Sequence, residues 1–255
     1  MQTPSTPLQK IVAWMDAELN VAGISDYPGA LNGLQVENRG AVRNIAAAVD
    51  ACESSIKEAV RTGAGLLIVH HGLFWSGAQS VTGAVYRKLR LAMENDLAIY
   101  SCHLPLDFHP KLGNNALLAR ALGWKKTAPF LTQQGQATGL QASLAIDRNV
   151  LHQRLEKAVG GRVHLCPGGP QRCRRIGLVT GGAGSEVAKA AAEGVDTYIT
   201  GEGPHWSYTL AEELGINVFY AGHYATETFG VRALAEAASR KFRLPWEFID
   251  HPTGL

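Results

Sequence analysis

The sequence has few cysteines, no long apolar run and little net charge. Its four cysteines among 255 residues show no CxxC spacing, which argues against a disulfide framework or a cysteine-rich zinc module and predicts a reduced, cytoplasmic setting. No apolar run approaches the roughly 20 residues that a membrane-spanning helix needs. The first ten residues, MQTPSTPLQK, have no basic region followed by an apolar stretch, so we expect no secretory signal.

The net charge limits the binding partners to be expected, and the composition indicates the class of protein. A net charge of +2 is too small to predict electrostatic attraction to nucleic acid or to an anionic membrane. Hydrophobic residues make up 46% of the chain and charged residues 18%, which is typical of a folded globular protein. The length allows two lobes of ordinary domain size, each with its own core.

Apolar strands alternate with amphipathic helices along most of the chain. This alternation predicts an α/β fold, with mixed or largely parallel sheets covered by helices. In such sheets ligands gather at the carboxyl ends of the strands. The expected helices are residues 7–20, 53–62, 84–96, 114–122, 149–159, 185–193, 207–214 and 226–241.

The pattern occurs twice. Residues 44–75 align with residues 175–206 at one constant offset and without a gap, and both segments close with Gly-x-x-Trp. A second block, AIYSCHLPLD (98–107), aligns with VFYAGHYATE (218–227). We therefore predict two similar layered α/β lobes that arose by internal duplication, over residues 1–127 and 128–255.

Each copy carries a histidine and a carboxylate four residues later. The alignment matches His103 with His223 and Asp107 with Glu227. Imidazole and carboxylate are ligands suited to Zn, Fe or Mn, and carboxylate oxygens are able to bridge two ions. The sequence thus predicts a metal site built at the interface between the two lobes.

His70 and His71 follow the apolar strand GLLIV directly. Neighbouring residues on a strand point to opposite faces, so the pair suits one mononuclear site poorly. At the end of a strand the two rings can diverge, each toward a different ion. The alternative is two polar residues that merely cap the strand.

The two His-x-x-x-carboxylate motifs also have structural alternatives. Asp107 lies between Pro105 and Pro110, which predicts a stiff loop rather than a helix, and an aspartate in a turn commonly binds backbone amides. Glu227 falls in the expected first turn of a helix, where a carboxylate complements the helix dipole. The correspondence between the two copies favours the metal interpretation.

Two further motifs are weaker. Glu202 aligns with His71, and Glu202 or His205 is a candidate for orienting a ligand histidine through its other ring nitrogen; a structural turn is the alternative. The segment Gly181-Gly-Ala-Gly184 follows a strand, as phosphate-binding loops do, but it lacks a full GxGxxG or P-loop pattern.

A set of motifs in fixed order resembles the Nif-three-like family. The motifs are NGLQVE (32–37), VHHGLFW (69–75), HLPLDFHPKLGNNALLA (103–119), TGEG (200–203) and GHYATE (222–227). Bacterial members of that family are called GTP cyclohydrolase I type 2 homologs or dinuclear-metal-centre hexameric proteins. The resemblance implies a duplicated α/β fold and a toroidal homohexamer, without the extra central domain of longer relatives.

The resemblance also implies site residues. Carried over by motif, the ligands of two divalent ions are His70, His71, Asp107, His223 and Glu227, with Glu227 bridging. His103 is the candidate for proton transfer or for supporting a ligand. The identity of the metal (Fe, Zn or Mn) stays open.

The implied activity is a metal-dependent hydrolysis. A water between two divalent ions loses its proton near neutral pH and becomes a nucleophile, and the family name points to C8 of the guanine of GTP, with release of formate. Two other functions stay open. One is a non-catalytic metal-binding or interaction protein, and the other is a different hydrolase, such as a phosphoesterase or amidohydrolase.

Overall fold

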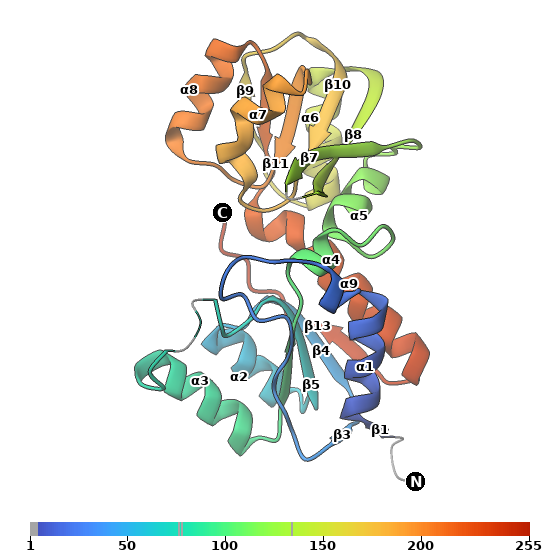
Figure 1. The fold of residues 1–255 in the computed structure, drawn as a ribbon, viewed down its shortest axis with the longest axis vertical. Coiled ribbons are helices and arrows are strands. Elements are labelled where there is room, and N and C mark those ends of the chain that lie inside the picture. The colour runs from blue at the N-terminus through green and yellow to red at the C-terminus, as the bar shows by residue number, and fades with distance from the viewer. Residues whose placement is uncertain (1–4, 76, 78, 134) are drawn as a thin grey trace. The chain divides into compact units, whose positions relative to one another are not determined.

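The chain folds into two compact units. The computed structural model describes residues 5–75, 77, 79–133 and 135–255. Unit 1 comprises Met1–His109 and Gly230–His251, and unit 2 comprises Pro110–Phe229 and Pro252–Leu255. The predicted boundary between residues 127 and 128 therefore differs from the division in the structure, because the C-terminal segment 230–251 returns to unit 1 (Figure 1).

Unit 1 is built around one five-stranded sheet with the order β13-β4-β5-β6-β2. β13, β4, β5 and β6 are parallel, and β2 is antiparallel to β6. The elements are β1 (Thr6–Pro7), α1 (Leu8–Glu18), η1 (Val21–Gly23), β2 (Gly33–Val36), β3 (Ala41–Val42), β4 (Ile45–Asp50), α2 (Glu53–Arg61), β5 (Leu66–His71), α3 (Gly83–Glu94), β6 (Ala98–Ser101), α4 (Leu104–Asp107), the part of α9 (His223–Phe242) from residue 230 onward, and β13 (Trp246–Phe248).

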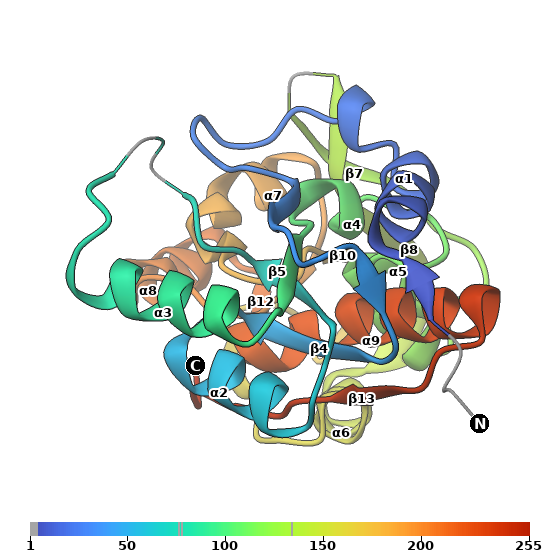
Figure 2. The same ribbon diagram turned by 90° about the horizontal axis from the view of Figure 1, so that it is seen from below.

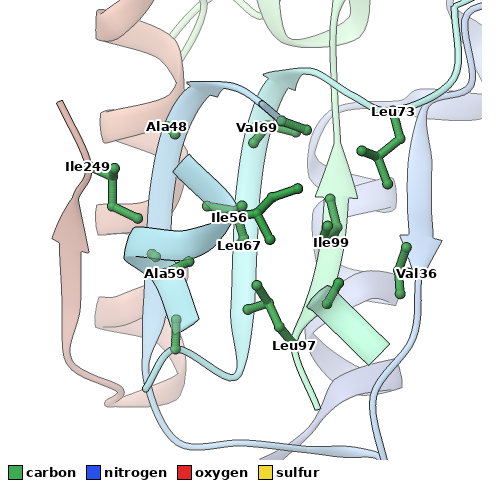
Figure 3. Packing of buried hydrophobic residues seen from close by; sticks show 14 of the residues in the cluster. Val36, Ala48, Ile56, Ala59, Leu67, Val69, Leu73, Leu97, Ile99 and Ile249 are labelled. Atoms are coloured by element: carbon green, nitrogen blue, oxygen red, sulfur yellow. The ribbon is translucent and has the colours of Figure 1, made fainter. Parts of the chain in front are cut away.

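Both faces of this sheet are buried. Along β5, Leu67 and Val69 join the cluster that includes Ile56 of α2 and Ala92 of α3, and α2 and α3 lie side by side (Figure 2). Figure 3 shows this packing, with α2 in front of the strands. The alternate residues of β5 are fully buried as well, which explains why GLLIV is a continuous apolar run instead of an alternating one.

We expect Leu67→Ala to destabilise unit 1 by about 2–5 kcal/mol, because it deletes buried methyl groups and leaves a cavity. Leu67 is fully buried, whereas Met93 on α3 is 63% exposed. Met93→Ala is the control and should change stability by no more than about 0.5 kcal/mol. Urea unfolding followed by circular dichroism measures both, and equal midpoints for the two variants would contradict the packing described here.

Unit 2 contains a six-stranded sheet with the order β7-β8-β10-β11-β12-β9. β10, β11 and β12 are parallel, while β8 and β9 flank them in the antiparallel sense. The elements are α5 (Asn114–Ala121), β7 (Ala128–Gln133), β8 (Gln136–Asp147), α6 (Arg148–Val159), β9 (His164–Pro167), β10 (Arg172–Leu178), η2 (Ala183–Glu186), α7 (Val187–Ala192), β11 (Thr197–Thr200), α8 (His205–Leu214), β12 (Asn217–Tyr220) and the start of α9.

Helices cover both faces of the second sheet too. Ile199 of β11 belongs to a buried cluster with residues of α5 and α6. Its neighbour Tyr198 belongs to a different cluster, with residues of α7 and α8. Since successive residues of a strand point to opposite faces, the two helix pairs lie on opposite sides of the sheet.

The predicted repeat is visible in strand register. Ile45 of β4 pairs with Leu66 of β5, and the equivalent residues of the second copy, Ile176 and Thr197, pair in the same way. The next strand differs by one position, since Leu66 pairs with Ala98 whereas Thr197 pairs with Asn217 and not with Val218. The two units therefore share a three-stranded parallel core, and the second sequence block is displaced by one residue.

Local signals explain where α6 begins and ends. The Asp147 carboxylate accepts hydrogen bonds from the backbone N–H groups of Asn149 at 2.8 Å and Val150 at 3.4 Å, as an N-cap residue does. Gly160 ends the helix with φ 69°, a left-handed conformation that glycine adopts without steric cost.

The cysteines and the helices of the structure test two predictions made from the composition. All four cysteines are present as free thiols, in line with the absence of a disulfide framework. Among the helices of the described residues, none has both the length and the apolar character required to span a bilayer.

Candidate metal centre

The adjacent histidines form the end of a buried strand. His70 and His71 are the last two residues of β5, not residues that follow it. His70 is fully buried, and the two ring centroids are 4.8 Å apart. The two rings thus lie close together at this strand end, although neighbouring residues of a strand point to opposite faces.

Each of these rings is oriented by a bond to its Nδ1. His70 Nδ1 lies 3.0 Å from the carbonyl oxygen of Cys102, and His71 Nδ1 lies 2.8 Å from Asp50 Oδ1. Carbonyl and carboxylate oxygens only accept hydrogen bonds, so each Nδ1 carries the proton and donates it. In the neutral ring the lone pair is then on Nε2, which is the arrangement found in metal-ligating histidines.

Asp107 lies on a helical turn, contrary to the predicted loop. α4 runs from Leu104 to Asp107 with Pro105 in its first turn, where a missing N–H and a fixed φ are tolerated. The turn places Asp107 Oδ2 3.4 Å from His70 Nε2. A carboxylate oxygen and the candidate ligand nitrogen of His70 are thus close to each other.

His103 is held by a network around Asp26. His103 Nδ1 lies 2.9 Å from Asp26 Oδ1, and Asp26 Oδ2 accepts from Asn32 Nδ2 at 2.8 Å and from the N–H of Leu104 at 3.1 Å. Burial raises the pKa of Asp26, but the bonds and charge of His103, with help from Asn32 and the N–H of Tyr27, lower it to about 2. Asp26 is therefore ionised near neutral pH and accepts the hydrogen bond from His103 Nδ1.

Three histidines of unit 1 meet at this point. His70, His71 and His103 each offer one ligand atom, and these atoms lie within 4.8 Å of one another. Such a group suits a divalent cation of the Zn, Fe or Mn type, since imidazole binds all three. The sequence analysis assigned His103 to proton transfer or ligand support and not to the ligands themselves. Its position does not distinguish these roles, because its ligand atom lies within the same 4.8 Å as those of His70 and His71.

In unit 2 the candidate ligands share one helix. α9 begins at His223, three residues before the predicted start, so His223 is in its first turn and not at a strand end. Residues four apart lie on the same face of a helix, and His223 Nε2 is accordingly 3.1 Å from Glu227 Oε2. Glu227 is only 3% exposed, which is unusual for a carboxylate.

Glu202 orients His223 from the loop after β11. His223 Nδ1 lies 2.9 Å from Glu202 Oε1, which is the supporting role that the sequence suggested for Glu202 or His205. His205 is instead the exposed first residue of α8. Burial lowers the pKa of His223, but Glu227 and Glu202 outweigh burial and raise it to about 9. The two carboxylates beside His223 that raise its pKa are also of the ligand type that a divalent cation uses.

The glycine-rich segment packs against this pair. Gly181 has φ 72°, and a Cβ at this position would overlap Glu227 Oε1. The Gly181 N–H also donates to Thr226 Oγ1 at 3.0 Å, on the same helical turn as Glu227. Gly181 therefore gives the buried carboxylate room within unit 2, a role that differs from the phosphate-binding loop considered from the sequence.

Gly181→Ala should destabilise the protein more than Gly160→Ala. Both glycines have a left-handed φ, 72° and 69°, which costs alanine about 1–2 kcal/mol. Among the described residues nothing lies within 4 Å of a Cβ at Gly160, so only Gly181→Ala adds overpacking, about 1–3 kcal/mol. Urea unfolding measures the difference, and equal losses would show that residue 181 has space for a side chain.

The structure accounts for the six predicted residues as two sets. Unit 1 brings together His70, His71, His103 and Asp107, and unit 2 pairs His223 with Glu227. The sequence reasoning missed Asp50 and Asp26, which orient His71 and His103. A signal for Asp50 existed, because it ends the strand next to β5 and is in register with His71. Asp26 lies in an irregular loop that gave no such signal.

Comparison with known proteins gives full-length matches. The family model described as Duf34/NIF3 (NGG1p interacting factor 3) matches residues 6–253. The GTP cyclohydrolase 1 type 2 homolog of Deinococcus radiodurans is 40% identical over 248 residues, which cover 96% of this chain and 94% of that relative.

Solved structures agree with this match. TTHA1606 from Thermus thermophilus is 37% identical with a TM-score of 0.90, covering 98% of this chain and 100% of that one. Reduced HcgD from Methanocaldococcus jannaschii is 26% identical with a TM-score of 0.86, with the same coverage. The similarity extends over both units.

Proposed function

The chain belongs to the Duf34/NIF3 family, and from this premise we propose that it is a metal-dependent hydrolase acting on a nucleotide or related substrate. The proposed ligands of two divalent ions are His70, His71 and Asp107 of unit 1 and His223 and Glu227 of unit 2. The substrate class follows the name GTP cyclohydrolase 1 type 2 homolog that relatives carry.

One observation carries the proposal. In four histidines, Nδ1 lies 2.8–3.0 Å from an oxygen that can only accept a hydrogen bond. Metal-ligating histidines commonly donate their other ring N–H to such an oxygen, as the proposed ligands His70, His71 and His223 do here. The donor set fits Zn, Fe or Mn. The four oxygen partners are the Cys102 carbonyl and the carboxylates of Asp50, Asp26 and Glu202.

Bound divalent ions would supply Lewis acidity, which polarises a substrate oxygen and makes a water a better nucleophile at neutral pH. The chain's own contribution is to fix the imidazoles and to manage protons. Asp26 holds the proton on Nδ1 of His103, so that Nε2 of His103 is the atom that accepts and returns a proton during hydrolysis. An ionised Asp26 stabilises the charged ring that forms in between.

The test is a substrate panel on the purified chain reconstituted separately with Zn, Mn and Fe. GTP, other nucleotides, phosphoesters and amides are offered, and release of formate, phosphate or amine is measured. Formate from GTP supports cyclohydrolase chemistry, and phosphate or amine alone supports another hydrolase. Retention of metal with no turnover of any substrate would replace the proposal with a non-catalytic metal-binding or interaction protein.

We also propose a toroidal homohexamer, as the family resemblance implies, and a cytoplasmic location, as the few cysteines predict. Light scattering of the metal-loaded protein measures the assembly directly. A monomeric or dimeric mass would contradict the hexamer and would leave the ligand assignment unaffected.

A further inference from the structure

An exposed tyrosine lies beside the histidine proposed to transfer protons. Tyr27 is 60% exposed, and its ring centroid is 5.7 Å from that of His103, with the planes inclined at 34°. A large aromatic ring that could have packed into the core instead lies at the surface next to the candidate site. Its ring is therefore accessible at the surface beside the candidate site.

Trp75 approaches the same histidine. Its ring centroid is 4.9 Å from that of His103 at an interplanar angle of 83°, and 5.4 Å from that of His71. The indole Nε1–H donates to the carbonyl of Gly72 at 3.0 Å, which fixes the ring. His103 is thus bordered by two aromatic side chains of unit 1.

The loop that carries Tyr27 is fastened to His103. The N–H of Tyr27 donates to Asp26 Oδ1 at 2.7 Å, and Asp26 binds His103. Asn32 also bonds to both Asp26 and His103. Its Oδ1 accepts from the backbone N–H of His103 at 2.7 Å, and its Nδ2 donates to Asp26 Oδ2. The backbone of Tyr27 is therefore held in position relative to the histidine, which lowers part of the entropic cost of using this residue to bind a ligand.

We propose that Tyr27, with Trp75, recognises a flat heteroaromatic ring, and that this ring is the base of the nucleotide substrate. Aromatic side chains stack on any base because every base has a π face. The ions held by the neighbouring proposed ligands would bind the polar part of the same molecule. The inference rests on the proposed function and adds to it the part of the substrate that the aromatic residues bind.

The experiment compares Tyr27→Ala, Tyr27→Leu and Tyr27→Phe in the full, zinc-loaded chain. Calorimetry measures binding of GTP, of guanosine and of tripolyphosphate, which has no ring. Loss of the aromatic ring should weaken GTP and guanosine about tenfold in both the alanine and the leucine variant, and phenylalanine should restore binding. Affinity for tripolyphosphate should stay at the wild-type value.

Tyr86→Ala is the matched control, because Tyr86 is a similarly exposed tyrosine (49%) on α3 and should bind as wild type does. Wild-type affinity for guanosine in Tyr27→Leu, an equal loss for tripolyphosphate, or a change of assembly mass in Tyr27→Ala would each overturn the inference. So would a wild-type chain that binds neither GTP nor guanosine. Metal analysis of the same samples separates the two proposals, since a chain that keeps its ions but ignores the ring contradicts only this one.

Discussion

A chain with both His223→Ala and Glu227→Ala is expected to bind at least one divalent ion fewer than the wild-type chain, which should hold about two. His223 Nε2 and Glu227 Oε2 lie 3.1 Å apart on one face of α9, and Glu227 is nearly inaccessible to solvent. Removing both side chains deletes one nitrogen and one carboxylate of the proposed ligand set. Elemental analysis of the purified proteins gives the metal content directly.

The chain offers a matched control for this experiment. His152 and Glu156 have the same spacing on α6, and His152 Nε2 is 3.7 Å from Glu156 Oε1. Neither residue is a proposed ligand, and His152 Nε2 also lies 2.8 Å from the carbonyl oxygen of Val163. The double alanine variant at these two positions should keep the wild-type metal content. Equal metal content in all three proteins would remove Glu227 and His223 from the site.

His103→Gln is expected to retain the metal and to lose hydrolytic activity by about 10²–10⁴-fold, the usual contribution of a general acid–base. The reason is the bond from His103 Nδ1 to Asp26, which leaves Nε2 of His103 as the ring atom available for proton transfer. The measurements are turnover of whichever substrate the panel identifies and metal content of the same sample. Added imidazole should restore part of the rate.

The opposite outcome for His103 is equally informative. Its ligand atom lies within 4.8 Å of those of His70 and His71, so loss of an ion in His103→Gln would make it a ligand and exclude the proton-transfer role proposed here. His164→Gln is the control, because His164 is an exposed residue of β9. It should keep both metal and activity.

The regular parts of the fold could be predicted because their signals are local. GLLIV is a short apolar run and TYIT is rich in β-branched and aromatic residues, and the structure has strands there, β5 from Leu66 onward and β11. The constant offset between residues 44–75 and 175–206 predicted equivalent strands, and the register of Ile45 and Ile176 confirms it. Such information is present in every short window of the sequence.

Other elements depend on partners far along the chain. β7 was not predicted. It begins at Ala128, has Pro129 as its second residue and is an edge strand of its sheet, the position in which a sheet tolerates proline. β13 has only three residues and exists through its pairing with β4. α4 was excluded because Pro105 was treated as a helix breaker, although proline is compatible with a first turn.

The site divides in the same way. The ligand types could be predicted because two histidine–carboxylate motifs align between the copies. Their orienting partners could not, since the bonds of His71 to Asp50 and of His103 to Asp26 arise only when distant segments pack together. Burial of Glu227 against Gly181 is likewise a property of the folded unit.

The pairing of β13 with β4 has a consequence for biosynthesis. Ribosomes release the N-terminal strands first, yet the neighbour that completes the hydrogen bonding of β4 on its outer side is made from residues 246–248. A nascent chain must therefore carry an open, apolar strand edge while all of unit 2 is being translated, and such edges recruit foreign strands. Shielding of this edge by a chaperone would limit that exposure until residues 246–248 have been translated.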